Sequence, residues 1–221
     1  MTTALLVGAS GLVGGHCLRF LLKEPRYTQV VSVGRRRLPL QHIKLAQHVI
    51  DFEQLPASAE WLTADAVFCC LGTTFSKAGS QEAFRRVDFG YPYELARIAA
   101  CRGAEQFLLV SALGADTQSR WFYNRVKGET ENAISQLPFR GVQIFRPSLL
   151  QGNRDEFRLA EWVGLTLARW FPWRLAGPLR RYQPVKAEAV AYAMVAVARE
   201  NLAGVNVFEA EEIRSLFAGL E

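Results

Sequence analysis

Long apolar runs are missing from this sequence. No stretch of about 18 uncharged apolar residues occurs in it, so we expect no transmembrane segment. The apolar stretch at the N-terminus has no cation before Arg19, which is not typical of a secretory signal peptide. We therefore expect neither a membrane span nor export by that route.

Cysteine is scarce and irregularly spaced. No CxxC pair occurs, and the one adjacent pair falls inside an apolar, strand-like run; the four residues are Cys17, Cys69, Cys70 and Cys101. This spacing is not typical of zinc motifs or of a disulfide framework. We expect reduced core thiols, no metal site and a cytoplasmic location.

Lysine is also scarce, since only 5 of the 26 basic residues are lysine. The arginines are spread from Arg19 to Arg214 and form no basic arm, so the sequence does not favour a nucleic-acid partner. The net charge of +5 fits a small ligand that carries phosphate equally well.

Short apolar runs alternate with longer segments of helical period along most of the chain. We expect strands at 4–7, 30–33, 48–51, 66–71, 107–111 and 142–145, helices near 12–23, 92–102, 122–137 and 187–200, and a final strand and helix. At 221 residues, half of them apolar, the chain suits one domain. The predicted fold is α/β, a Rossmann-type doubly wound parallel sheet over residues 1–221.

Three glycines follow the first expected strand at GxxGxxG spacing. In such a turn the first glycine allows a tight bend, the second lets a diphosphate approach the backbone, and the third lets helix and strand pack closely. The spacing predicts a dinucleotide site, although glycines also occur in strand-to-helix turns for geometric reasons alone. The expected contacts are Gly8, Ser10, Gly11, Leu12, Val13 and Gly14.

Arginines follow the second expected strand, where a chain that binds NAD usually carries an acidic residue. Guanidinium groups suit a 2′-phosphate, so Arg35 and Arg36 favour NADP(H) as the cofactor. The alternative is a solvated basic turn, to which Arg37 is assigned.

Two further loops fall at the same expected sheet edge. Asp51 and Phe52 follow the third strand, where the carboxylate could meet an adenine amino group or cap a helix. The fourth strand ends in Leu71, Gly72, Thr73 and Thr74, which could let backbone pass a ribose or diphosphate or could form a plain turn.

A serine, a tyrosine and a lysine are spaced as a catalytic set. Ser111 ends the fifth strand, Tyr123 opens the next helix, and Lys127 lies one turn further on the same face. An ammonium there can stabilise the phenolate and hold a ribose hydroxyl, Tyr123 can exchange a proton with a substrate oxygen, and Ser111 can orient a carbonyl. An ordinary exposed Tyr and Lys are the alternative.

Several strings together resemble one family. The sequences CCLGTTFSKAGS (69–80), FRRVDFGY (84–91), GAD (114–116), VKGE (126–129) and FRPSLL (145–150) are similar to the Tat-interacting protein subgroup of atypical short-chain dehydrogenases/reductases and its bacterial relatives. The resemblance implies a Rossmann fold, bound NADPH and a Ser111-Tyr123-Lys127 triad, but no settled reaction. Asp88 replaces a helix Asn that relays protons in many dehydrogenases, and an ionised Asp cannot donate.

The resemblance also implies where a substrate lies. Pro147, Ser148 and Leu149 would run past the nicotinamide, a simple sheet-end turn being the alternative. Residues 112–121 and about 150–221 would frame the substrate side of the domain. We expect Phe75, Trp121 and Phe122 to form apolar walls of the substrate pocket.

Two functions fit these expectations. One is an NADPH-dependent reductase of a small carbonyl substrate with Tyr123 as proton donor. The other is a non-catalytic NADP(H) sensor that contacts a protein partner. With either function, the sequence allows a monomer or a dimer. A weaker interpretation makes the Trp/Arg-rich segment 162–181 a membrane-surface element.

Overall fold

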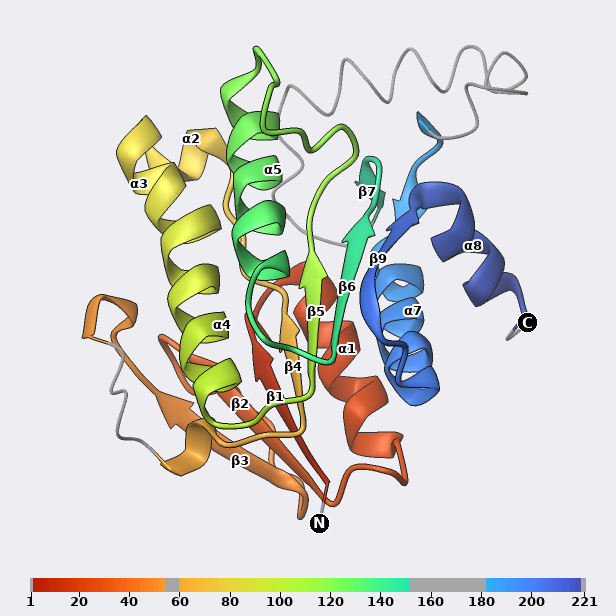
Figure 1. Ribbon diagram of the computed structural model, residues 1–221. Coiled ribbons are helices and arrows are strands. Elements are labelled where there is room, and N and C mark those ends of the chain that lie inside the picture. Colours follow the sequence, from red (N-terminus) through yellow and green to blue (C-terminus); the bar gives the residue numbers. More distant parts are fainter. Residues whose placement is uncertain (1, 55–59, 152–181, 220–221) are drawn as a thin grey trace.

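A parallel seven-stranded sheet forms the centre of the molecule in a computed structural model, which describes residues 2–54, 60–151 and 182–219 (Figure 1). The strands lie in the order β3, β2, β1, β4, β5, β6, β9. Their bounds are β1 Thr3–Val7, β2 Gln29–Gly34, β3 Leu45–Val49, β4 Ala66–Cys69, β5 Gln106–Val110, β6 Gly141–Arg146 and β9 Gly204–Glu209. The predicted doubly wound parallel sheet is confirmed.

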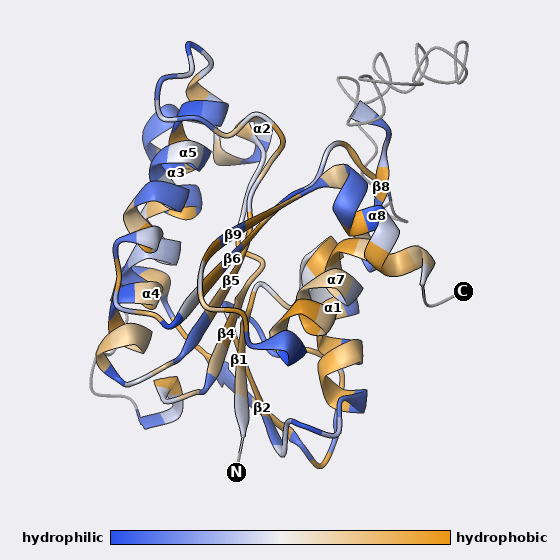
Figure 2. Cartoon of the chain, turned by 45° about the vertical axis from the view of Figure 1, so that its right-hand side comes forward, coloured by the Kyte–Doolittle hydropathy of each residue, from blue (hydrophilic) through white to orange (hydrophobic). Residues whose placement is uncertain are grey.

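Helices cover both faces of the sheet. Figure 2 shows α1 (Leu12–Lys23), α7 (Ala187–Glu200) and α8 (Ala210–Ala218) on one side. The other side carries α2 (Phe75–Ala78), α3 (Gln81–Arg85), a π-helical turn η3 (Arg86–Gly90), α4 (Tyr91–Cys101) and α5 (Phe122–Ser135). Each βαβ connection therefore returns the chain to a parallel strand.

Alternate strand residues supply the two halves of the core. Leu5 and Val7 pack with the α4 and α5 side, whereas Ala4 and Leu6 pack with the α1 and α7 side. All four are fully buried. This two-sided burial explains why β1 reads as a continuous apolar run rather than an alternating one.

The third strand differs from the prediction of 48–51. It spans Leu45–Val49, because its ladder with β2 ends where Gly34 pairs with Val49. Asp51 therefore lies beyond the strand, at the start of the 3₁₀ turn η1 (Phe52–Gln54). A second 3₁₀ turn, η2, spans Glu60–Leu62.

Several short elements were not predicted. They are α2, α3 and η3, which precede α4, and the two-stranded sheet of β7 (Leu150–Gln151) and β8 (Val185–Lys186). Cys101 is exposed at the end of α4, so the prediction that all four cysteines are core residues is wrong for this one.

No helix in the described ranges is both long and apolar enough to span a membrane. The Trp/Arg-rich segment 162–181 lies outside the described residues.

Candidate functional site

The glycine turn lies at the point where the order of the strands reverses. The strands β1 and β4 are neighbours there, and ligands of doubly wound sheets bind in the crevice beyond the carboxyl ends of such strands. Gly8, just after β1, has φ +86°, and a Cβ at this position would lie 2.5 Å from the carbonyl oxygen of Cys70. Only glycine lets the turn pass so close to the end of β4.

The start of α1 packs onto the same turn. A Cβ on Gly14 would lie 2.1 Å from the carbonyl oxygen of Gly8, and the Gly11 amide donates to that oxygen at 2.8 Å. No described side chain caps this helix at Gly11, which leaves amide groups of its first turn for an anion. Of the other predicted contacts, Ser10 is exposed, Leu12 is partly buried and Val13 is buried.

Arg35 and Arg36 directly follow β2 and are exposed. Neither guanidinium pairs with a carboxylate among the described residues. Two cations therefore lie beyond the carboxyl end of the strand next to β1, on the side where the ribose of a bound dinucleotide would lie.

Asp51 caps η1 in the structure. Its Oδ1 accepts a hydrogen bond of 3.0 Å from the Glu53 amide, which is the capping alternative left open by the sequence. Phe52 is buried with its ring 5.3 Å from that of Tyr91. Tyr91 donates to Glu53 Oε1 at 2.6 Å, and burial together with this bond raises the pKa of Tyr91 to about 12. Neither Glu53 nor Tyr91 was predicted as a site residue from the sequence.

The loop after β4 is tied to its surroundings by hydrogen bonds. Thr74 caps α2, its Oγ1 accepting from the Lys77 amide at 3.3 Å. The Thr73 amide donates to Asp88 Oδ2 at 2.9 Å. A Cβ on Gly72 would lie 3.4 Å from Asp88 Oδ1, so the backbone of the loop lies directly against this carboxylate, and Leu71 precedes it, half-buried.

The predicted triad is distributed over β5 and α5. Ser111 follows β5 and is 5% exposed, and its Oγ has no hydrogen-bond partner among the described residues. Tyr123 lies in the first turn of α5 and is 40% exposed. Lys127 is one turn further along, with its side chain 8% exposed. The three side chains thus come from the carboxyl end of β5 and the first turns of α5, at the end of the sheet where α2 also lies (Figure 1).

Lys127 and Asp88 form a buried ion pair. Lys127 Nζ lies 2.8 Å from Asp88 Oδ1, and the Asp88 side chain is fully buried. Burial, the largest single effect, lowers the pKa of Lys127, but Asp88 together with Tyr123 and Cys69 offsets it and holds this pKa above its ordinary value. Lys127 is therefore an ammonium at neutral pH.

The loop between β5 and α5 is held against the helix. A Cβ on Gly128 would lie 2.4 Å from the carbonyl carbon of Asp116, and Asn124 Nδ2 donates to the Gly114 oxygen at 2.8 Å. These contacts fix the connection between Ser111 and Tyr123. The strings GAD and VKGE carry Gly114, Asp116 and Gly128, but no contact between them was predicted from the sequence.

Hydrogen bonds hold the segment after β6, residues 147–149, in place. Pro147 is buried and its oxygen accepts from the Leu113 amide at 2.9 Å, while the Leu149 oxygen accepts from the Val185 amide at 2.9 Å. Ser148 Oγ donates to the Gln183 oxygen. The carbonyl groups of Pro147 and Leu149 thus each accept a hydrogen bond within the protein.

A cluster of aromatic rings reaches Tyr123 through Phe84. The Phe84 ring lies 5.5 Å from the Tyr123 ring and 5.8 Å from that of Phe122, and Phe75 lies 6.3 Å from Phe122. Phe75 is half exposed and Trp121 is 78% exposed. Of the three residues predicted for an apolar wall, Phe75 and Phe122 lie together, whereas Trp121 is exposed to solvent; Phe84, which was not predicted, packs against Phe122 instead.

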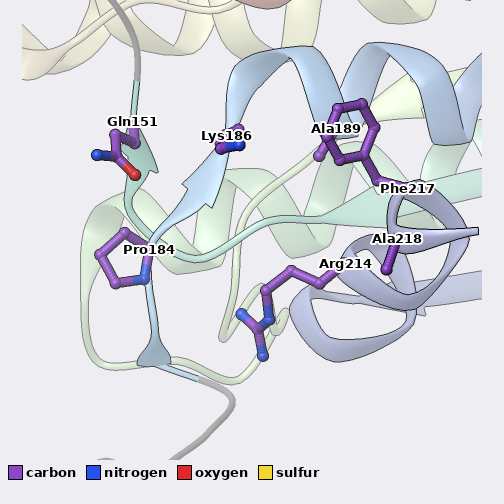
Figure 3. A pocket seen from close by; sticks show the side chains of 7 residues that line it. All are labelled: Gln151, Pro184, Lys186, Ala189, Arg214, Phe217 and Ala218. Atoms are coloured by element: carbon purple, nitrogen blue, oxygen red, sulfur yellow. The ribbon is translucent and has the colours of Figure 1, made fainter. Parts of the chain in front are cut away.

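A separate pocket of about 210 Å³ lies beside α8 (Figure 3). Its lining residues are Gln151, Pro184, Lys186, Ala189, Arg214, Phe217 and Ala218. Lys186 Nζ lies 5.8 Å from the ring centre of Phe217, and Arg214 donates to the Gln183 oxygen. None of the predicted site residues lines this pocket.

Comparison with known proteins identifies the family. Protein HTATIP2 of Rattus norvegicus is 38% identical over 165 residues, which cover 73% of this chain and 68% of that protein. The chain belongs to the HTATIP2/FMP52 group of atypical short-chain dehydrogenases/reductases. Protein FMP52 of Lodderomyces elongisporus is 31% identical to this HTATIP2/FMP52 chain over 216 residues, which cover 90% of the chain and 88% of that protein. No family model matches the chain.

Solved structures show the same fold as this HTATIP2/FMP52 chain. MoeE5 in complex with UDP-glucose and NAD has a TM-score of 0.69 at 18% identity, over 99% of this chain and 81% of that one. The human epimerase family protein SDR39U1 with NADPH has a TM-score of 0.60 at 17% identity, over 95% and 74%. At these identities the likeness establishes the fold alone.

The expected cytoplasmic location is wrong. FMP52 proteins of Scheffersomyces stipitis, Aspergillus clavatus and Lodderomyces elongisporus are named mitochondrial, which points to mitochondria instead.

Proposed function

We propose that the protein binds NADP(H) and reduces a small carbonyl compound, with Tyr123 as the proton donor. The observation that carries this proposal is the geometry around Lys127. Its ammonium is buried and held at 2.8 Å by Asp88, one helical turn from a partly exposed Tyr123. A rigid cation beside a phenol is the arrangement that proton transfer to a substrate oxygen needs.

The glycine turn supports a dinucleotide as the cofactor. The backbone of Gly8 and the uncapped start of α1 leave space and amide groups for a diphosphate. Structures with the same fold were solved with NAD, in MoeE5, and with NADPH, in SDR39U1. The exposed cations Arg35 and Arg36 favour the form that carries a 2′-phosphate.

Each side chain of the triad has a physical role in this reaction. Bound NADPH supplies the hydride. The buried Ser111 hydroxyl, which has no described hydrogen-bond partner, orients the substrate carbonyl by donating to its oxygen. Tyr123 then gives its phenolic proton to that oxygen, and the Lys127 ammonium stabilises the resulting phenolate and donates to a ribose hydroxyl.

A second function is favoured by Asp88. A proton relay along the helix needs a group that can both accept and donate, but both oxygens of this carboxylate are engaged, one with Lys127 and one with the Thr73 amide. A protein that binds NADP(H) without turnover and signals its occupancy to a protein partner needs no such relay.

The two functions differ in the effect of Tyr123→Phe. For the reductase, NADPH oxidation with a panel of aldehydes, ketones and quinones should fall about 100-fold or more in kcat, while NADPH affinity stays unchanged. Tyr93→Phe, on α4, is the matched control and should retain full activity. If the wild-type protein binds NADPH and oxidises it with none of these substrates, the reductase proposal is wrong and the sensor is favoured.

A further inference from the structure

Asp88 joins three separate elements through one carboxylate. It lies on η3, its Oδ1 is 2.8 Å from Lys127 Nζ on α5, and its Oδ2 accepts from the Thr73 amide in the loop after β4 at 2.9 Å. The side chain is fully buried, so neither interaction competes with solvent. A buried carboxylate held by an ion pair and a hydrogen bond is fixed in position.

The backbone around Asp88 is fixed as well. Thr130 Oγ1 on α5 lies 2.9 Å from the Asp88 carbonyl oxygen. The π-helical turn that carries Asp88 departs from the regular helical path between α3 and α4, and such turns are frequent at functional sites. Main chain and side chain of Asp88 therefore both contact α5.

The two groups that Asp88 holds lie beside each other. A Cβ on Gly72 would come 3.4 Å from Asp88 Oδ1 and 3.6 Å from Lys127 Nζ, so this loop and the ammonium form one continuous surface. Lys127 lies one turn from Tyr123 on α5. The surface thus lies next to the reactive phenol.

We propose that Asp88 is a positioning residue that holds Lys127 and the Gly72–Thr73 backbone together as one rigid side of the subsite for the nicotinamide ribose. It is not a link in a proton chain. This inference rests on the proposed NADP(H) binding. Asp88 acts only through Lys127 and the loop and touches neither cofactor nor substrate itself.

Two nucleotide probes test this role by calorimetric titration. Adenosine 2′,5′-bisphosphate carries only the adenosine half of NADPH, whereas NADPH spans both halves. In Asp88→Asn, NADPH affinity should fall about tenfold or more, because the ammonium loses its partner, while affinity for the bisphosphate stays within about twofold of wild type. Equal losses for both probes, or no loss for either, would overturn the positioning role.

A double variant shows whether Asp88 acts through Lys127. Lys127→Met should weaken NADPH binding by a similar factor, and Asp88→Asn combined with Lys127→Met should be no weaker than Lys127→Met alone. Multiplied losses in the double variant would contradict the inference. The double variant also removes both buried charges and keeps the test usable if Asp88→Asn does not fold.

The protonation of Lys127 can also be followed in the wild-type protein, with a variant used only to assign the signal. The Cε resonance of Lys127, assigned with Lys127→Met, should titrate at higher pH than an ordinary lysine because Asp88 stabilises its charged form. Titration at or below the ordinary value would contradict a stabilisation of the ammonium by Asp88 that offsets its burial. Failure of wild type to bind either nucleotide would instead overturn the proposed function, and this inference with it.

Discussion

Two adjacent glycines near the start of α1 have different surroundings. A Cβ on Gly14 would lie 2.1 Å from the Gly8 oxygen, whereas a Cβ on Gly15 would meet its nearest neighbour, the Ala9 oxygen, at 3.6 Å. Gly14→Ala should therefore lower the free energy of unfolding by about 2 kcal/mol or more, because backbone must move. Gly15→Ala should raise it by roughly 0.5 to 1 kcal/mol through helix propensity. Urea unfolding measures both, and the same sign for the two variants would contradict the packing described for this turn.

The role of single residues was easier to predict from the sequence than the side chains with which they interact. The positions of the glycines in the turn follow from spacing, and the structure shows why Gly8 and Gly14 admit no side chain. The pair of Asp88 and Lys127 could not be predicted, because it joins distant parts of the chain through a π-helical turn. The sequence placed Asp88 in a doubtful relay, whereas the structure makes it the ion-pair partner of Lys127 and the acceptor for the Thr73 amide.

At the scale of elements, Arg146 joins one helix to two strands. It lies at the end of β6, its Nε is 3.0 Å from Glu131 Oε1 on α5, and its Nη1 is 3.4 Å from Glu209 Oε1 on β9. The Glu131 side chain is only 7% exposed. Arg146→Met should lower the free energy of unfolding by about 3 kcal/mol, because a nearly buried carboxylate loses its partner.

An exposed ion pair provides the control for Arg146. Arg97 and Glu94 pair on the surface of α4, with side chains 47% and 41% exposed. Arg97→Met should lower the free energy of unfolding far less than Arg146→Met does, since solvent screens such pairs. Similar losses for the two variants in urea unfolding would show that burial of Glu131 contributes little.

Long elements with a clear period were predicted well. The bounds expected for the helices at 12–23 and 187–200 agree with α1 and α7. The short α2 and α3 offer too few turns for a period to show, and a π-helical turn breaks the 3.6-residue pattern. The strand β3 is an edge strand with mostly half-buried side chains, so its apolar signal is weak and its predicted position was shifted.

At the scale of the whole molecule, alternation of strands and helices was enough to predict the sheet. Connections that alternate in this way lead to a parallel sheet with helices on both faces, and the observed strand order places the glycine turn at its reversal point. The cellular compartment was predicted wrongly, because cysteine spacing and the lack of long apolar runs do not distinguish cytoplasm from mitochondria. Names of relatives corrected it.

We expect this fold to bind NADP(H) through the glycine turn and the two arginines after β2. Calorimetric titration with NADPH and NADH tests it most directly, on wild type, on Arg35→Ala combined with Arg36→Ala, and on Arg37→Ala as a matched exposed control. Wild type and the control should prefer NADPH, and the double variant should lose about tenfold or more in NADPH affinity while NADH affinity holds. Equal affinities of wild type for NADPH and NADH would contradict the account.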